Sequence, residues 1–176
     1  MAGLHHTLCT VQRVGGNMTQ VTFVCTGNVC RSAVAEAILK KMVRIRQIPD
    51  VVVNSVGTQN LCGAHRDGTM ARIAAGYGYL MDGTSTFRSE EILKKADLIL
   101  VMTHSHRLEM QNLMPYERWG CIRLFMEYCF DKDIPVEDPS YMPESVYHRT
   151  FQTIEQGCRV IADRLQKGLD ETPLVI

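Results

Sequence analysis

The sequence lacks any apolar run near the roughly 20 residues that a membrane-spanning helix needs. It also lacks an excess of either charge, because 19 basic residues balance 19 acidic ones. A neutral chain gives no indication of a nucleic-acid or membrane partner bound through charge. The 176 residues, 45% of them hydrophobic and 22% charged, are instead typical of a globular domain with its own core.

Metal-binding spacings are missing as well. None of the seven cysteines forms a Cys-x-x-Cys pair. His104 and His106 are two positions apart in a stretch with helical character, so they face different sides and are interpreted as solvated side chains. We therefore expect neither a metal nor another cofactor.

The N-terminal segment lacks the basic start and apolar stretch of a secretion signal. We expect a cytoplasmic protein whose cysteines remain thiols, and their odd number agrees with that. Residues 1–18 show no clear periodicity and contain a Gly-Gly-Asn turn. We expect them to be a flexible leader or a vector remnant, and residues 19–176 to form a single domain.

Apolar runs alternate with amphipathic stretches along the rest of the chain. Buried β-strands are predicted at 21–25, 51–57, 97–102 and 121–128. Helices are predicted at 32–46, 67–80, 89–96, 104–114 and 145–169. This alternation predicts an α/β fold in which a four-stranded parallel sheet has helices on both faces. Ligands of such sheets bind at the carboxyl ends of the strands.

The segment CTGNVCRS, residues 25–32, follows the first predicted strand and opens the first predicted helix. Gly27 and Asn28 tolerate a left-handed backbone, so the loop can curl and aim its N–H groups at an anion by the helix N-terminus. Arg31 can donate two hydrogen bonds to a tetrahedral anion. Cys25 would lie at the mouth of this site, where the same field favours a thiolate.

A thiolate beside a bound phosphate is suited to in-line attack that gives a phosphocysteine. Ser32 can donate a hydrogen bond to the sulfur. The Cys-x5-Arg spacing alone is weak, because residues 158–164 share it without glycine, without a preceding strand and within a predicted helix. We interpret that second copy as structural. The competing interpretation of residues 25–32 is a strand–helix turn with a buried thiol.

Cleavage of a phosphate ester also needs a proton for the leaving oxygen. Asp138 is the candidate, because Pro139 fixes the backbone directly after it. Tyr141 offers an aromatic wall for a planar substrate group. The competing interpretation is an ordinary surface turn, in which Asp-Pro dipeptides are common.

These motifs together resemble the low-molecular-weight protein tyrosine phosphatase family. VCTGNVCRSAVAE at 24–36 is similar to the family signature V-C-x-G-N-x-C-R-S-P-x-A-E, with Ala33 in place of the proline. NSVGT at 54–58, ADLILVM at 96–102 and VEDPSY at 136–141 are similar to later parts of the family. The resemblance implies a metal-independent phosphatase that acts on phosphotyrosine in proteins and releases inorganic phosphate.

The resemblance also implies a role for each site residue. Cys25 would be the nucleophile, Arg31 would hold the phosphate, and Asp138 would be the general acid and then the general base. The residues expected to line the substrate site are Thr26, Gly27, Asn28, Val29, Cys30, Ser32 and Tyr141. Ser55 is expected to support the loop together with Asn28, and Ser32 to help hold the thiolate.

Cys30 matches a second cysteine of the family. It is expected either to form a reversible disulfide with Cys25 under oxidants or to serve as a small buried residue. Two departures from the tyrosine-specific pattern concern the crevice. Ser140 stands where many members have the first of two tyrosines, and Thr103 stands where many have aspartate.

Protein arginine phosphatases have the same fold and loop and form the alternative substrate class. CTGN and the Met-Thr pair followed by histidine resemble that branch. The branch typically carries threonine where this chain has Val29, and the threonine hydroxyl helps to position attack on a phosphoramidate. Tyrosine-specific members usually have an aliphatic residue there, so Val29 favours phosphotyrosine.

Two further classes are less consistent with the sequence. Arsenate reductases of this fold relay a disulfide through extra cysteines after the second helix, and residues 63–120 contain none. A phosphoprotein-binding module without activity would ordinarily have lost the nucleophile or the acid, and this chain carries Cys25, Arg31 and Asp138.

Overall fold

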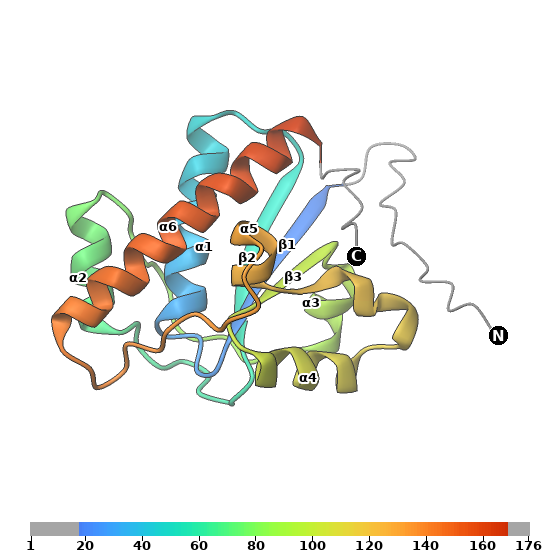
Figure 1. Ribbon diagram of the computed structural model, residues 1–176, viewed down its shortest axis with the longest axis horizontal. Helices are drawn as coiled ribbons and strands as arrows, with labels where there is room; N and C mark the ends of the chain where they lie inside the picture. The colour runs from blue at the N-terminus through green and yellow to red at the C-terminus, as the bar shows by residue number, and fades with distance from the viewer. Residues whose placement is uncertain (1–17, 169–176) are drawn as a thin grey trace.

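Four short apolar segments pair as parallel strands in the computed structural model, which describes residues 18–168 (Figure 1). The strands are β1 (Thr19–Cys25), β2 (Val51–Gly57), β3 (Leu98–Val101) and β4 (Ile122–Leu124). They lie in the order β2-β1-β3-β4, and every neighbouring pair is parallel. The predicted α/β sheet is thus confirmed, whereas the predicted leader lies outside the described residues except for Met18.

Helices connect the strands and follow the last one. They are α1 (Arg31–Ile45), α2 (Gly68–Gly76), α3 (Glu90–Lys95), α4 (His104–Leu113), α5 (Phe125–Phe130) and α6 (Glu144–Lys167), with a 3-10 turn η1 (Tyr116–Cys121). The side chains of Asp67 and Ser89 accept hydrogen bonds from Met70 N and Ile92 N. These caps satisfy backbone donors that a helix start leaves unpaired, and they begin α2 and α3 where the sequence predicted.

The alternation of side chains along β1 divides the core into two layers. Val21, Phe23 and Cys25 belong to one buried cluster, which also receives side chains of α1, α2, α5 and α6. Val24 belongs to the other, which receives side chains of α3 and α4. A strand places alternate residues on opposite faces, so one strand anchors both layers. Figure 1 shows α1 and α6 on one side of the sheet and α3 and α4 on the other.

The fourth predicted strand has three residues, well under half the length expected for 121–128. Strand pairing stops at Leu124, and α5 begins at Phe125. The sequence does not decide the boundary, because the short apolar run 124–126 is consistent with a buried strand and with a buried helix. Phe125 is fully buried and lies against Gly157 of α6, where a Cβ would come within 2.3 Å of its ring.

The second predicted helix also ends early, at Gly76 rather than at residue 80. Gly78 adopts a left-handed φ of 76°, and the N–H groups of Tyr77 and Tyr79 both bond to the Ala74 carbonyl. A glycine in this conformation ends helices readily because it carries no Cβ. The residues after it are therefore free to turn back toward α1.

The carboxyl edge of the sheet collects the parts of the chain that the sequence singled out. β1 ends at Cys25, α1 begins at Arg31, and α4 begins at His104 just after β3. The loop that follows α5 returns to this edge, where Val136 N donates to Met102 O at 2.9 Å. Within residues 18–168, no helix combines the length and the apolar character that crossing a membrane would require.

Candidate active site

The loop that is expected to bind phosphate is the bend formed by residues 26–30, between β1 and α1. Of the two residues expected to allow it to curl, Asn28 adopts the left-handed conformation, with a φ of 55°. Asparagine tolerates this region better than most residues with a Cβ. Gly27 instead makes room for a neighbour, since a Cβ on it would lie 2.8 Å from Leu61 Cδ1.

The buried amide of Asn28 ties the loop to its surroundings. Its Nδ2 donates to Ser32 Oγ at 2.9 Å and to Ser55 Oγ at 2.6 Å, and its Oδ1 accepts from Thr86 N at 2.8 Å. Asn28 is fully buried and Ser55 is nearly so. Each of these bonds satisfies a polar group that would otherwise be costly to bury, so together they fix the loop conformation.

Gly57, at the end of β2, allows the sheet and the loop to approach closely. A Cβ at this position would lie 2.8 Å from the Thr26 carbonyl oxygen and 3.1 Å from Asn28 N. Thr58 N and Gln59 N then donate to the carbonyls of Cys25 and Thr26, both at 2.9 Å. The glycine of NSVGT is therefore needed for space rather than for an unusual backbone angle.

Cys25 lies at the end of β1 with only 3% of its surface exposed. Its Sγ is 2.9 Å from Ser32 Oγ. Ser32 Oγ already accepts a hydrogen from Asn28, so its own hydroxyl hydrogen is available to the sulfur. Either atom can be the donor in this contact, and with serine as the donor the sulfur accepts, which is the arrangement that a thiolate prefers.

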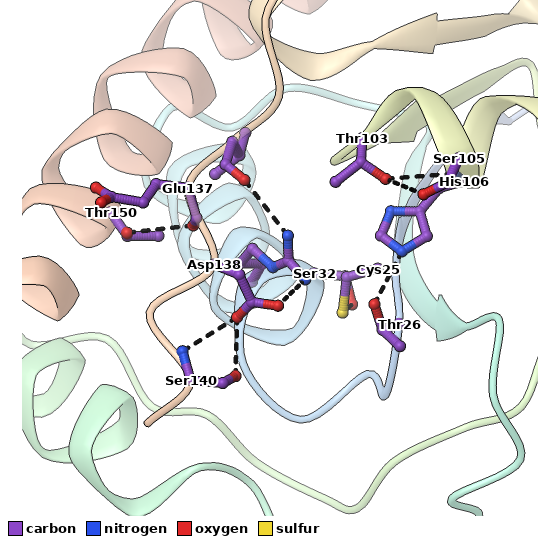
Figure 2. Close-up of polar contacts among 12 residues, drawn as sticks. Cys25, Thr26, Ser32, Thr103, Ser105, His106, Glu137, Asp138, Ser140 and Thr150 are labelled. Carbon is purple, nitrogen blue, oxygen red and sulfur yellow. Dashed lines mark hydrogen bonds and ion pairs between the residues drawn. The ribbon is translucent and has the colours of Figure 1, made fainter. Parts of the chain in front are cut away.

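Arg31 and Asp138, 107 positions apart, meet directly. Arg31 Nη2 lies 2.5 Å from Asp138 Oδ2, and Arg31 Nη1 donates to the Val136 carbonyl at 3.4 Å. The Arg31 side chain is 5% exposed and that of Asp138 is 47% exposed. Asp138 Oδ1 accepts from Ser140 N and Ser140 Oγ, so the turn holds the carboxylate toward the loop, as Figure 2 shows.

The remaining predicted substrate residues are placed around this group. Val29 is half-buried and packs against the core on the α1 side. Cys30 is 4% exposed, and burial raises the pKa of its thiol well above the ordinary value. Tyr141 is fully exposed and has a left-handed φ of 63°, so its ring stands in solvent beyond Asp138.

His106 is a site residue that the sequence reasoning missed. The expectation that it is solvated is wrong, because it is 3% exposed and its Nε2 lies 3.0 Å from Thr26 Oγ1 (Figure 2). Burial lowers its pKa to about 4, and the charge of Arg31 contributes in the same direction. His104 is half-exposed and pairs with Asp133 at 2.8 Å. The two-residue spacing was rightly interpreted as placing them on different sides, but one of those sides faces the loop.

Arg66 is the second residue that sequence reasoning missed. Its Nη1 donates to the Asn28 carbonyl and, at 3.2 Å, to Asn28 Oδ1. It follows β2 in a stretch of no clear periodicity, and nothing in the sequence indicated that it reaches the loop. A guanidinium at this position adds positive charge beside the loop.

The assembled groups are a thiol hydrogen-bonded to Ser32, a buried guanidinium and a carboxyl group on a turn. A guanidinium with a neighbouring helix start is suited to bind a tetrahedral oxyanion, and the thiol lies at the same loop. Within residues 18–168, no cluster of three or more His, Cys, Asp or Glu side chains is arranged to hold a metal ion. The thiol, the guanidinium and the carboxyl group together can support nucleophilic displacement at a phosphate.

Comparison with known proteins identifies the family of the chain. The sequence profile of the low molecular weight phosphotyrosine protein phosphatases matches residues 20–171. The chain belongs to this family. It is accordingly a phosphatase of the low molecular weight protein-tyrosine-phosphatase family, whose substrates are phosphorylated proteins.

Family relatives include enzymes with two different names. The chain is 30% identical over 148 residues to the low molecular weight protein-tyrosine-phosphatase Etp of Escherichia coli, covering 84% of this chain and 95% of that one. It is also 30% identical over 149 residues to the protein-arginine-phosphatase of Bacillus subtilis, covering 84% and 97%. A crystal structure of a protein tyrosine phosphatase from Entamoeba histolytica superposes with a TM-score of 0.79 at 27% identity, covering 86% and 99%.

Proposed function

We propose that this phosphatase hydrolyses phosphotyrosine in proteins through a phosphocysteine on Cys25, with Asp138 as the general acid. The observation that carries the proposal is the 2.5 Å contact between Arg31 Nη2 and Asp138 Oδ2. It brings a titratable carboxyl group to the guanidinium beside the thiol, although the two residues are far apart in sequence. A proton donor at the phosphate site is what ester cleavage requires.

The reaction proceeds in two displacements. The Cys25 sulfur attacks phosphorus, the bond from phosphorus to the phenolic oxygen breaks, and Asp138 gives its proton to that oxygen. Water then attacks the phosphocysteine while Asp138 accepts a proton from it. The bond from sulfur to phosphorus breaks, which restores the thiolate and releases inorganic phosphate. Arg31 holds the phosphoryl oxygens in both steps, where their charge is redistributed.

The ion pair between Arg31 and Asp138 has a consequence for substrate binding. A phosphate dianion that takes the hydrogen bonds of Arg31 must displace the Asp138 carboxylate from it. The freed carboxyl group then lies beside the bound phosphate, where it can give its proton to the leaving oxygen. Substrate binding thus prepares the general acid for the first step, and the same exchange reverses when phosphate leaves.

The choice of substrate depends in this proposal on Val29. Its side chain carries no hydroxyl that could position attack on a phosphoramidate, which supports phosphotyrosine over phosphoarginine. The alternative function is that of a protein arginine phosphatase. A relative with that name in Bacillus subtilis supports this alternative, so the two substrate classes must be compared directly.

The test is phosphate release from two peptides that differ only in carrying phosphotyrosine or phosphoarginine. We expect a higher kcat/KM for the phosphotyrosine peptide, and we expect Val29→Thr to shift the ratio toward phosphoarginine. Cys25→Ser serves as the control for contaminating phosphatase. Faster turnover of the phosphoarginine peptide by the unmodified chain would overturn the substrate assignment and establish the alternative.

A further inference from the structure

A cleft whose lining includes neither Arg31 nor Asp138 opens along α1. It has a volume of about 300 Å³ and lies between α1 and residues 78–82. Its charged lining residues are Glu36, Lys40, Lys41, Arg44, Arg66 and Asp82. The four cations and two carboxylates leave an excess of two positive charges here, in a chain whose formal net charge is zero.

The cleft has a fixed wall and an open rim. Lys41 Nζ donates to the Gly78 carbonyl at 2.7 Å and lies 4.8 Å from the centre of the Tyr79 ring, which holds residues 78–79 against α1. Lys40 pairs with Glu36 at 2.5 Å. Arg44 lies exposed at the rim, and no ion-pair partner is found for it within residues 18–168. Cationic donors are therefore available to a ligand without loss of the wall.

Arg66 belongs to the cleft and to the phosphate-binding loop at once. Its Nε donates to the Asp82 carbonyl at 3.2 Å, while its Nη1 donates to Asn28. Burial lowers the pKa of Arg66, and the negative charges of Glu36 and of a Cys25 thiolate act in the opposite direction. The guanidinium thus interacts favourably with a negative charge on the nucleophile.

Glu36 provides a second link between the two sites. Its Oε2 accepts a hydrogen bond from Ser55 Oγ, which itself accepts from Asn28 Nδ2, and Asn28 also bonds to Ser32. The chain of contacts from the cleft to the Cys25 sulfur therefore consists of adjacent hydrogen bonds. Changes in charge at Glu36 or Arg66 reach the loop directly.

We propose that this cleft binds a small phosphate-bearing anion, and that its occupancy weakens catalysis at Cys25 through Arg66. The excess positive charge favours a dianion, and the volume is at the small end of the range for ligand sites. A dianion beside Arg66 offsets the positive charge that stabilises the thiolate and attracts the substrate phosphate. Coupling between two binding sites is reciprocal, so phosphate substrate bound at the loop weakens the binding of the anion in the cleft by the same factor.

The first test measures binding by titration calorimetry in an Arg31→Ala variant, in which the catalytic loop no longer grips phosphate. The probes are inorganic phosphate and glycerol 2-phosphate. We expect at least one probe to bind at one saturable site. Adding Arg44→Glu should weaken its affinity at least tenfold. Adding Lys132→Glu, at an exposed position outside the cleft, should leave the affinity unchanged. Tighter binding of glycerol 2-phosphate than of inorganic phosphate indicates an organic phosphate ester as the ligand. Equal or tighter binding of inorganic phosphate indicates the free ion. Absence of saturable binding, or indifference to Arg44→Glu, would overturn the proposal.

The second test needs no variant of the catalytic loop. Inorganic phosphate bound only at that loop competes with substrate, whereas phosphate bound also in the cleft lowers kcat as well. We expect mixed inhibition of p-nitrophenyl phosphate hydrolysis by the unmodified chain and by Lys132→Glu, and purely competitive inhibition by Arg44→Glu. Purely competitive inhibition of the unmodified chain would overturn the coupling. Neither test depends on whether the natural substrate carries phosphotyrosine or phosphoarginine.

Discussion

Two segments of this chain share the spacing Cys-x5-Arg, yet their environments differ completely. Residues 25–31 join a strand to a helix, and residues 158–164 lie within α6. In the first segment, side chains from other elements hold the loop, among them Ser55 from β2 and His106 from α4. The backbone of the second segment is regular α-helix, so its conformation does not depend on such side-chain contacts.

The second segment shows what the pattern does outside a loop. Positions six apart on a helix point about 120° away from one another, so cysteine and arginine cannot act on one ligand. Cys158 is fully buried, and burial raises the pKa of its thiol well above the ordinary value. Arg164 instead stacks 4.4 Å from the centre of the Tyr128 ring. The comparison teaches that the spacing has chemical meaning only where the backbone folds both side chains toward one point.

The largest expected difference between the two segments concerns the nucleophile. Cys25→Ser should lower turnover on the order of 10⁴-fold or more, which is the scale of removing a nucleophile. Cys158→Ala should leave turnover within about twofold and instead lower the free energy of unfolding by about 1–2 kcal/mol, because it removes a packed core atom. Phosphate release and urea unfolding measure the two effects. Appreciable turnover by Cys25→Ser would contradict the assignment.

Asp138 has no counterpart near the second segment, and its removal should produce the next largest effect. Asp138→Asn should slow hydrolysis of esters with poor leaving groups by roughly 10²–10⁴-fold, the usual contribution of general acid catalysis. Esters with good leaving groups need less protonation and should be slowed less. The same variant should bind vanadate more tightly, because Arg31 loses its competing ion pair. A slowdown independent of the leaving group would assign the acid to another residue.

The two arginines should respond differently to the same conservative change. Arg31→Lys removes the two-pronged geometry that grips phosphate and should lower kcat/KM by roughly 10²-fold or more. Arg164→Lys keeps a cation over the Tyr128 ring and should change stability by less than about 1 kcal/mol, without an effect on kcat/KM. Steady-state kinetics on both variants checks this. If both variants lost kcat/KM equally, Arg31 would have no special role in binding phosphate.

The fold was largely predictable because its periodicities are strong. All four strands and five of the helices follow from runs of apolar residues, and the Asp67 and Ser89 caps follow from their side chains. The α5 helix was missed because a short apolar run can be a strand or a buried helix, and packing of Phe125 against Gly157 decides between them. That contact joins residues distant in sequence, so a local sequence pattern cannot predict it.

The candidate site was predictable where its residues lie in one motif. Cys25, Arg31 and Ser32 are close in sequence, and the structure places them at one loop, with Asp138 against Arg31. His106 and Arg66 were missed because each reaches the loop through tertiary packing. A histidine just after a buried strand at the carboxyl edge of the sheet is the one signal that could have found the first of them.

The support that His106 gives the first segment predicts a smaller, pH-dependent effect. Its Nδ1 is buried without a hydrogen-bond partner among the described residues, and its pKa is lowered to about 4 from the ordinary 6.5. The unfolded chain therefore binds the proton more readily than the folded chain. Stability from a neutral His106 is complete above about pH 6.5 and is lost as the pH falls toward 4, by at most about 1.4 kcal/mol per pH unit.

Urea unfolding between pH 7 and pH 5 measures this slope. His106→Gln keeps a hydrogen-bond donor for Thr26 but cannot titrate, so it should flatten the profile while retaining most of kcat/KM. His65→Gln, at an exposed position with no ion pair found within residues 18–168, should leave the slope unchanged. Arg31 and Asp138 face His106, and neither charge is removed by these changes, so the difference between the two variants isolates the buried ring. Equal slopes in both variants would mean that the loop does not depend on a neutral histidine.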